Sequence, residues 1–212
     1  MTTTNRPYTL RKRSQTVEET RRRIIKAARD LIEDAGYSNI SLDRIADAAQ
    51  VSRQTIYVQF GSKLGVLTAI VDEIENSGLQ ELYASLREMT DPVALLRKVI
   101  PQDVEFMHKN ARIFRVFRAQ AVTDADFRAV LDERMAGRFG SMHRLVKWLH
   151  REGKLAPGWT VEEATQWLFT TTGFHTYNEM VNQHGWTLEH LNRRLIETVE
   201  TMLLTAEARG KK

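Results

Sequence analysis

Apolar residues recur at i, i+3 and i+4 along nearly the whole chain, which is the spacing of one face of an α-helix. In the first long segment they are Val17, Ile24, Ala28, Leu31 and Ala35, and Gly36 is expected to end that helix. No stretch alternates between apolar and polar positions as a half-buried strand would. The pattern therefore predicts an all-α protein.

The helical pattern changes character along the chain and suggests three segments. Residues 1–14 are rich in Thr and Arg and show no periodicity, so we expect a flexible basic arm, or a solvated tail without a role. Residues 15–62 hold one long and two short predicted helices. Residues 63–212 hold longer ones and form a second, larger segment. Pro101 should kink or split one of its helices, and the last two helices are expected at about 161–183 and 188–208.

Residues 41–63 carry the strongest local signal. Ser41 and Ser52 are placed as N-caps of two short helices, and the small residues Ala46 and Ala49 let these helices approach closely. Ile56 should anchor the second helix inward. Two short helices joined by a tight turn predict a helix-turn-helix, the motif that presents its second helix to the major groove of DNA.

The side chains of this segment suit DNA. Arg and Gln form bidentate hydrogen bonds with guanine and adenine, whereas Ser, Tyr and Lys suit phosphates. Residues 1–63 hold 12 Lys and Arg against 7 Asp and Glu, and the rest of the chain holds 19 against 20, so the excess positive charge lies beside the motif. The alternative is that the serines only cap helices and Tyr57 only packs. The candidate DNA-binding residues are Ser41, Ser52, Arg53, Gln54, Thr55, Tyr57, Gln59 and Lys63.

A series of short motifs follows in order along residues 24–28, 33–37, 41–46, 49–52, 55–57 and 60–63, with Leu67 after them. Through these motifs residues 17–67 resemble the DNA-binding domain of TetR-like (tetracycline-repressor-like) transcriptional regulators. The match departs from the family pattern at Gln50, where Gly is usual at the turn and a left-handed backbone is required, and at Leu64 and Gly65, where a Glu is usual.

The resemblance implies a recognition helix that begins at Arg53, phosphate contacts from Ser41 and Lys63, and an arginine-rich arm that enters the minor groove. It also implies a homodimer formed through the last two helices, and a small-molecule effector bound by the central helices. On this resemblance residues 63–212 are the effector-binding and dimerisation domain. The apolar face expected at the dimer contact is Leu188, Leu191, Leu195, Val199 and Met202. The alternative is that these residues pack only within one chain.

The candidate effector-binding residues combine aromatic rings with a few polar groups, a mixture typical of ligand sites but also of ordinary cores. They are Phe106, Phe114, Phe117, Trp148, Trp167, Thr171, Phe174, His175 and Tyr177.

Other chemistry is not indicated. The chain has 0 Cys, its 6 His lack the spacing of metal ligands, and no nucleotide loop or nucleophile motif occurs, so we expect no cofactor, no metal and no enzyme activity. No segment reads as a membrane span or a secretory signal, and a cytoplasmic protein is expected.

We therefore expect a ligand-responsive regulator that binds a palindromic operator as a dimer, repression being favoured over activation. Two rivals stay open: a helical enzyme or small-molecule binding protein with a non-functional DNA-binding domain, and a basic binder of nucleic acid or membrane surfaces without sequence preference.

Overall fold

Helices make up almost all of the described chain. The computed structural model describes the backbone of residues 6–210 and the side chains of residues 15–76 and 89–210. Within residues 6–210 no strand occurs, only an isolated antiparallel bridge between Leu155 and Leu204, so the all-α prediction is confirmed. The elements are α1 (Arg6–Ala35), the 3-10 turn η1 (Tyr37–Asn39), α2 (Leu42–Ala49), α3 (Arg53–Phe60), α4 (Lys63–Glu88), α5 (Pro92–Lys109), α6 (Ala111–Thr123), α7 (Ala125–Arg151), α8 (Val161–Thr171), α9 (Phe174–Tyr177), the π-helical turn η2 (Asn178–Gln183) and α10 (Leu188–Leu203).

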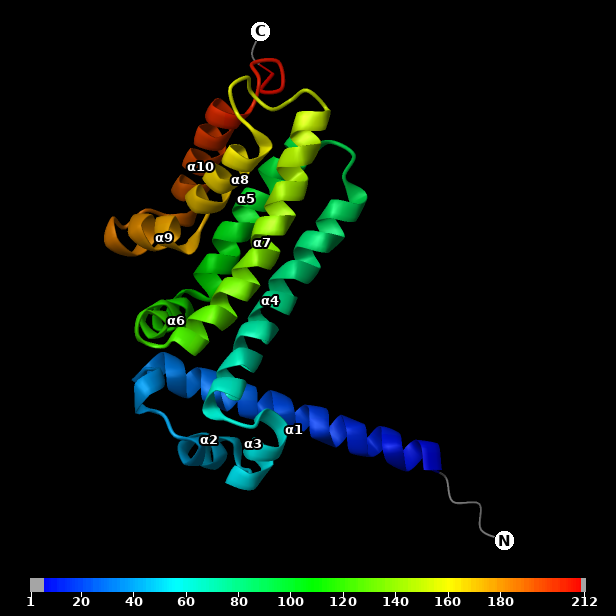
Figure 1. Cartoon of the computed structure of the whole chain (residues 1–212), viewed down its shortest axis with the longest axis vertical. Coiled ribbons are helices and arrows are strands. Elements are labelled where there is room, and N and C mark those ends of the chain that lie inside the picture. Colours follow the sequence, from blue (N-terminus) through cyan, green and yellow to red (C-terminus); the bar gives the residue numbers. More distant parts are fainter. Residues whose placement is uncertain (1–5, 211–212) are drawn as a thin grey trace. The chain divides into compact units, whose positions relative to one another are not determined.

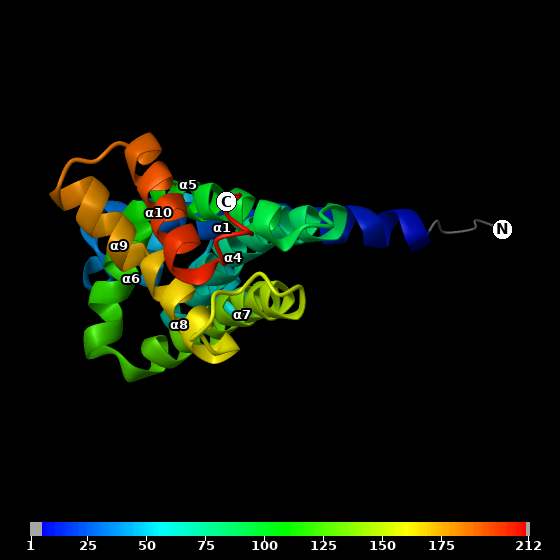
Figure 2. The same cartoon turned by 90° about the horizontal axis from the view of Figure 1, so that it is seen from above.

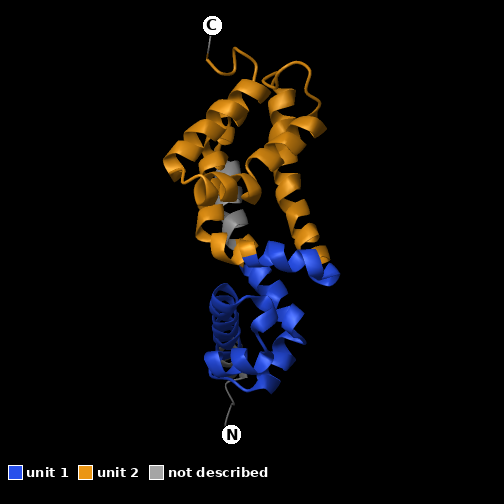
Figure 3. Ribbon diagram, turned by 90° about the vertical axis from the view of Figure 1, so that its left-hand side faces the viewer, with its two compact units in different colours: residues 1–73, 116–127 blue, residues 74–115, 128–212 orange. Residues whose placement is uncertain are grey.

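The chain folds into two compact units (Figure 3). The first comprises residues 1–73 and 116–127, and the second comprises residues 74–115 and 128–212. The division differs from the boundary expected near residue 62, because the start of α4 and the α6–α7 junction join the helix-turn-helix. No described helix is long and apolar enough to cross a membrane.

The first unit is built on the C-terminal half of α1. Ile24, Ile25, Ala28 and Ile32 form its buried stripe. α2 packs against α1, and α3 packs against α2 (Figure 1). Burial of this stripe therefore fixes the pair of short helices on one side of α1.

The start of α1 corrects one expectation. Residues 1–14 were predicted to be a flexible arm. Residues 1–5 lie outside the described residues, but α1 begins at Arg6. Pro7 is compatible with this, because the first turn of a helix has no internal partner for the amide that proline lacks. No Gly or further Pro follows before Gly36 to stop the helix, and exposed pairs such as Glu18 with Arg22, 3.6 Å apart, support it.

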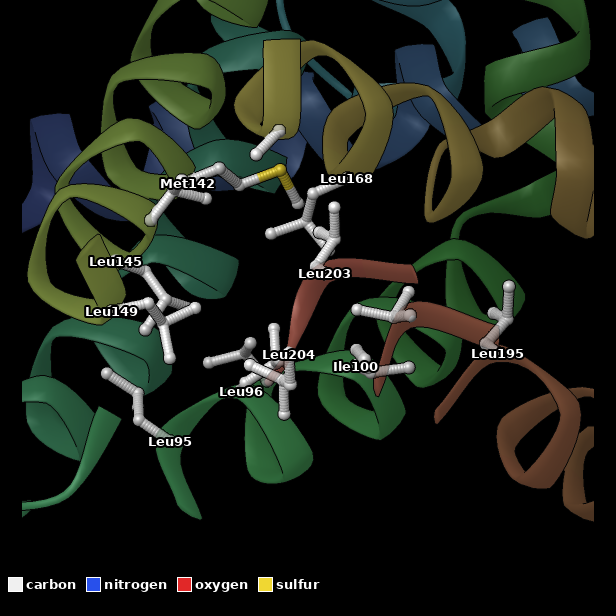
Figure 4. Close-up of a cluster of buried hydrophobic side chains, with 14 of the residues drawn as sticks. Leu95, Leu96, Ile100, Met142, Leu145, Leu149, Leu168, Leu195, Leu203 and Leu204 are labelled. Atoms are coloured by element: carbon white, nitrogen blue, oxygen red, sulfur yellow. The ribbon is translucent and has the colours of Figure 1, made fainter. Parts of the chain in front are cut away.

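The core of the second unit lies between α5, α7, α8 and α10 (Figure 4). Leu96 and Ile100 of α5, Leu149 of α7 and Leu168 of α8 point into it, all of them at most 1% exposed. α10 packs against α5 and α8 (Figure 2). α5 runs through Pro101 as one helix, where the sequence predicted a kink or a split.

The last helices differ from the prediction in two ways. The helix expected over residues 161–183 is interrupted at Thr172 and Gly173, so that α9 starts a new direction. Leu191, Leu195 and Val199 of α10 are buried in the core of their own chain. These three residues of the expected dimer face are thus covered within their own chain, whereas Leu188 is half-buried and Met202 is 40% exposed.

The turn between α2 and α3 holds Gln50 in a left-handed backbone conformation, with φ 53° and ψ 50°. The strain expected from the sequence is thus present. Replacing Gln50 with glycine is expected to raise the free energy of unfolding by about 0.5–1 kcal/mol, because a left-handed residue with a Cβ costs about 1–2 kcal/mol and glycine avoids most of this. Urea denaturation measures the change. Gln50→Ala keeps the Cβ and should give no gain; an equal gain from both variants would contradict the explanation.

Candidate DNA-reading surface and effector site

The two short helices of the first unit begin at serine caps. The Ser41 hydroxyl accepts a hydrogen bond from the amide of Arg44 at 3.2 Å, and the Ser52 hydroxyl accepts one from Thr55 at 3.1 Å. Both caps were predicted. The Val51 amide donates to the Ala46 carbonyl at 3.0 Å, which closes the turn. α3 is therefore held at a fixed angle with its N-terminus facing outward.

The outward face of α3 consists of Gln54, Tyr57 and Val58. All three are exposed, Tyr57 by 61% and Val58 by 73%. Ile56 is fully buried and anchors the opposite side of the helix. Phe60 is half-buried at the end of α3, where the Arg21 guanidinium of α1 lies 4.7 Å from its ring centroid. One side of α3 therefore packs on the unit, and the other is free to contact a ligand.

Arg53 lies at the first position of α3 and is exposed, but it is not free. Its guanidinium donates to the carboxylate of Asp43 in α2 at 3.1 Å. Both side chains are more than half exposed, so the pair contributes little stability in water. A base or phosphate could replace Asp43 as the partner of Arg53 at small cost.

The remaining candidate residues border the outward face. Thr55 is half-buried, and its hydroxyl lies 2.8 Å from that of Ser52. Gln59 is also half-buried, and its Oε1 atom is enclosed without a hydrogen-bond partner among the described residues. Neither projects as far from the unit as Gln54 or Tyr57.

Lys63 is turned into the first unit. Its ammonium donates to the carbonyl of Tyr37 at 2.5 Å and lies 4.0 Å from the centroid of the Tyr37 ring. Burial lowers the pKa of Lys63 below its usual value. Burial and then the nearby Asp124 carboxylate raise the pKa of Tyr37, whose ring stacks on Phe127 at 6.3 Å. Lys63 thus links the start of α4 to the α6–α7 junction.

Gly65 explains one departure from the family pattern. A Cβ atom at this position would lie 1.9 Å from the carbonyl oxygen of Phe60. Such a contact is sterically impossible without a backbone shift. The absence of a side chain therefore lets α4 leave α3 through a tight turn, which Ser62 closes by accepting a hydrogen bond from the Gly65 amide at 3.0 Å.

In the second unit, four of the predicted effector residues form one aromatic cluster. Phe114 of α6 lies 5.7 Å from Phe106 of α5 and 5.4 Å from Phe174 of α9, measured between ring centroids. Phe174 stacks on Tyr177 at 6.0 Å. The three phenylalanines are half-buried and Tyr177 is buried. The cluster thus joins α5, α6 and α9, directly before the π-helical turn η2, a feature common at functional sites.

Comparison with known proteins identifies the family that the helix-turn-helix matches. Residues 24–70 match the family described as bacterial regulatory proteins, tetR family, and this range contains the whole helix-turn-helix. Residues 24–70 therefore form a TetR-family DNA-binding domain, and the chain is similar to TetR-like transcriptional regulators. The DNA-binding class expected from residues 41–63 is confirmed.

Relatives of this TetR-like regulator match well beyond the helix-turn-helix. The transcriptional regulator RutR of Escherichia coli K12 is 28% identical over 155 residues, which is 69% of each chain. The transcriptional repressor BepR of Brucella suis is 24% identical over 197 residues, or 90% of this chain and 94% of BepR. The solved structure of a SmeT–triclosan complex superposes with a TM-score of 0.75 at 21% identity, covering 90% of this chain and 94% of SmeT. The fold is thus shared over most of the regulator.

The other predicted effector residues of the regulator lie elsewhere. Phe117 belongs to the first unit and packs on Phe127 at 5.4 Å. Trp148 lies near the C-terminal end of α7 and donates to Glu152 at 3.3 Å. Trp167 is 40% exposed and His175 is exposed, whereas Thr171 is half-buried. Helical spacing alone did not distinguish these positions from the cluster.

Sequence reasoning missed His108 beside the aromatic cluster. Its Nδ1 atom and the Tyr177 hydroxyl share a hydrogen bond of 2.9 Å. Burial raises the pKa of Tyr177, and the positive charge of Arg115 opposes that shift. His108 precedes the end of α5 by one residue, and no sequence signal relates it to a residue in α9.

Sequence reasoning also missed Arg138 of α7. Its guanidinium donates to the Asp103 carboxylate at 3.0 Å and to the carbonyls of Phe169 and Thr172 at 3.2 and 3.1 Å. Its Nε atom is buried and has no hydrogen-bond partner among the described residues. Arg138 therefore ties α5 and α7 to the C-terminal end of α8, where the chain turns into α9.

Proposed function

We propose that the protein is a ligand-responsive repressor that binds a palindromic operator as a homodimer and is released by a small-molecule effector. The exposed face of α3, on a helix whose other side is anchored by Ile56, is the observation that carries the proposal. One short helix reads few base pairs. Two copies that read half-sites one helical turn apart supply the missing affinity and specificity.

The proposed base contacts are Arg53 and Gln54, whose side chains can form bidentate hydrogen bonds in the major groove. Tyr57 and the capped N-termini at Ser41 and Ser52 suit phosphates. Thr55 and Gln59 border this surface. Lys63 joins the phosphate contacts when its ammonium leaves the Tyr37 carbonyl, and this exchange couples DNA binding to the α6–α7 junction.

The basic start of α1 supplies a further contact with DNA. Residues 6–14 contain Arg6, Arg11, Lys12 and Arg13 and no acidic residue. A helix with side chains is about 10–12 Å wide, whereas the minor groove is only about 6 Å wide. We therefore replace the expected minor-groove arm by a helix that lies against phosphates and adds sequence-independent affinity.

The proposed effector site is the aromatic cluster of Phe106, Phe114, Phe174 and Tyr177, with His108 as a hydrogen-bonding partner. Flat or apolar molecules suit stacked and edge-on rings, and the related SmeT fold was solved with triclosan. A bound effector acts through its preference for one of two conformations and shifts the equilibrium by that difference in affinity.

The proposed dimer contact uses the outer faces of α8 and α10. Trp167 of α8 and Met202 of α10 are each 40% exposed. Trp159 lies between them, with its ring centroid 6.1 Å from that of Trp167 and its Nε1 donating to the Met202 carbonyl at 2.7 Å. A second copy of the chain would cover these side chains. Met202 belongs to the face first expected, whereas Leu191, Leu195 and Val199 of that face are covered within their own chain.

Replacing Trp167 with aspartate is expected to raise the dimer dissociation constant roughly 30-fold or more, because buried tryptophans are frequent hot spots worth about 2 kcal/mol. Analytical ultracentrifugation over a concentration series measures the shift. Val122→Asp is the control, since Val122 is an exposed apolar residue of α6. An unchanged dimer dissociation constant for Trp167→Asp would show that α8 does not take part in the dimer contact.

Selection from a random duplex library tests the function itself. The purified protein should enrich a two-fold symmetric sequence, and an effector found by thermal-shift screening should release it. Substituting Phe114 by alanine should abolish the effector response and preserve operator binding. Enrichment of no common sequence would overturn the proposal.

A further inference from the structure

The outward face of α3 contains an apolar side chain that the fold does not use. Val58 is 73% exposed, although the neighbouring positions Ile56 and Phe60 are turned toward the unit. Val58 follows Gln54 by one helical turn, so the two side chains lie next to each other on the same face. Any surface that receives Gln54 therefore also meets Val58.

The chemistry of the major groove limits what Val58 can contact there. Base edges present hydrogen-bond donors and acceptors, and the 5-methyl group of thymine is the apolar group among them. The valine side chain ends in two methyl groups and has no polar atom. An apolar contact with thymine removes both surfaces from water, whereas a contact with a hydrogen-bond donor or acceptor of a base edge would bury a polar atom without a partner.

We propose that Val58 is a specificity-determining residue that contacts the 5-methyl group of a thymine, in or beside the base pair read by Gln54. The inference rests on the proposed function, because it requires α3 to enter the major groove. Since glutamine pairs with adenine in the groove, Gln54 and Val58 together select an A·T-containing step in each half-site.

Deoxyuridine substitution tests this contact, since uridine lacks the methyl group and pairs like thymine. In the operator obtained by selection, each thymine is replaced singly, and binding is measured by fluorescence anisotropy. For the unmodified protein, replacing one particular thymine of a half-site should lower the affinity for the operator about fourfold, which is the value of one buried methyl group. Val58→Ala should bind the thymine operator more weakly and should be insensitive to that replacement.

Two controls separate the methyl contact from other effects. Val122→Ala changes an equally exposed valine of α6 and should keep the full uridine response. An operator with cytosine at the sensitive position should regain affinity when that cytosine is 5-methylated, and should do so only with Val58 present.

The outcomes also distinguish this inference from the proposed function. If the protein prefers the operator over random duplex but no thymine responds to uridine, or if Val58→Ala responds like the unmodified protein, the Val58 contact is wrong and the regulator function stands. If operator and random duplex bind equally, the proposed function itself fails.

Discussion

Gln54→Ala is expected to weaken operator binding by about 1–3 kcal/mol in each half-site, because one bidentate base contact is lost per subunit. For a dimer bound to both half-sites the loss is about 2–6 kcal/mol. Gln54 is exposed at the start of α3 and is not needed by the fold. Affinity for random duplex should not change, since that binding depends on phosphate contacts. Anisotropy titrations of both duplexes give the two values.

The control for this variant is Gln183→Ala, which removes an exposed glutamine from η2 in the second unit, outside the proposed dimer contact. It should leave both affinities unchanged. A repeated selection with Gln54→Ala should return a sequence with relaxed preference at one position per half-site. The same preferred sequence from both proteins would exclude Gln54 as a base-reading residue.

Arg138→Ala is expected to lower the free energy of unfolding by about 3 kcal/mol, because the Asp103 carboxylate, whose side chain is only 19% exposed, is left without its partner. Burial raises the pKa of Asp103, and the Arg138 guanidinium opposes this shift from 3.0 Å. The carbonyls at the end of α8 lose their donor as well. Urea denaturation monitored by circular dichroism measures the loss.

A double-mutant cycle shows whether Arg138 and Asp103 contribute to the free energy of unfolding as a pair or independently. Removing Asp103 together with Arg138 should cost less than the sum of the two single replacements, since no uncompensated charge remains. Arg138→Lys should be intermediate, because an ammonium cannot reach Asp103 and both carbonyls with the same planar geometry. Additive losses would show that the two residues do not act as a unit.

Local features of the helix-turn-helix could be predicted from the sequence. The caps at Ser41 and Ser52 depend on residues three positions away, and the left-handed Gln50 was expected because TetR-like sequences usually have Gly at this turn. The start of α1 was not predicted, because the Arg-rich segment lacks an apolar stripe and was therefore interpreted as disordered. The residues of this segment are compatible with a helix, and Pro7 does not interrupt it because it lies in the first turn.

Non-local contacts could not be predicted. The spacing of Leu191 and Leu195 shows an apolar face on α10, but it does not show whether the same chain or a second copy covers it. Lys63 was assigned to phosphate from the motif, whereas its contact with Tyr37 spans 26 residues of sequence. His108 and Tyr177 meet because the chain turns at Gly173, which no helical period reveals.

The ratio of two dissociation constants tests the central claim most directly. The selected palindrome and a scrambled duplex of equal length are titrated at physiological salt, at protein concentrations above the dimer dissociation constant. We predict that the palindrome binds at least about 1,000-fold more tightly, with two subunits per duplex. Equal constants for the two duplexes, or one subunit bound per palindrome, would contradict a paired reading of the major groove by α3.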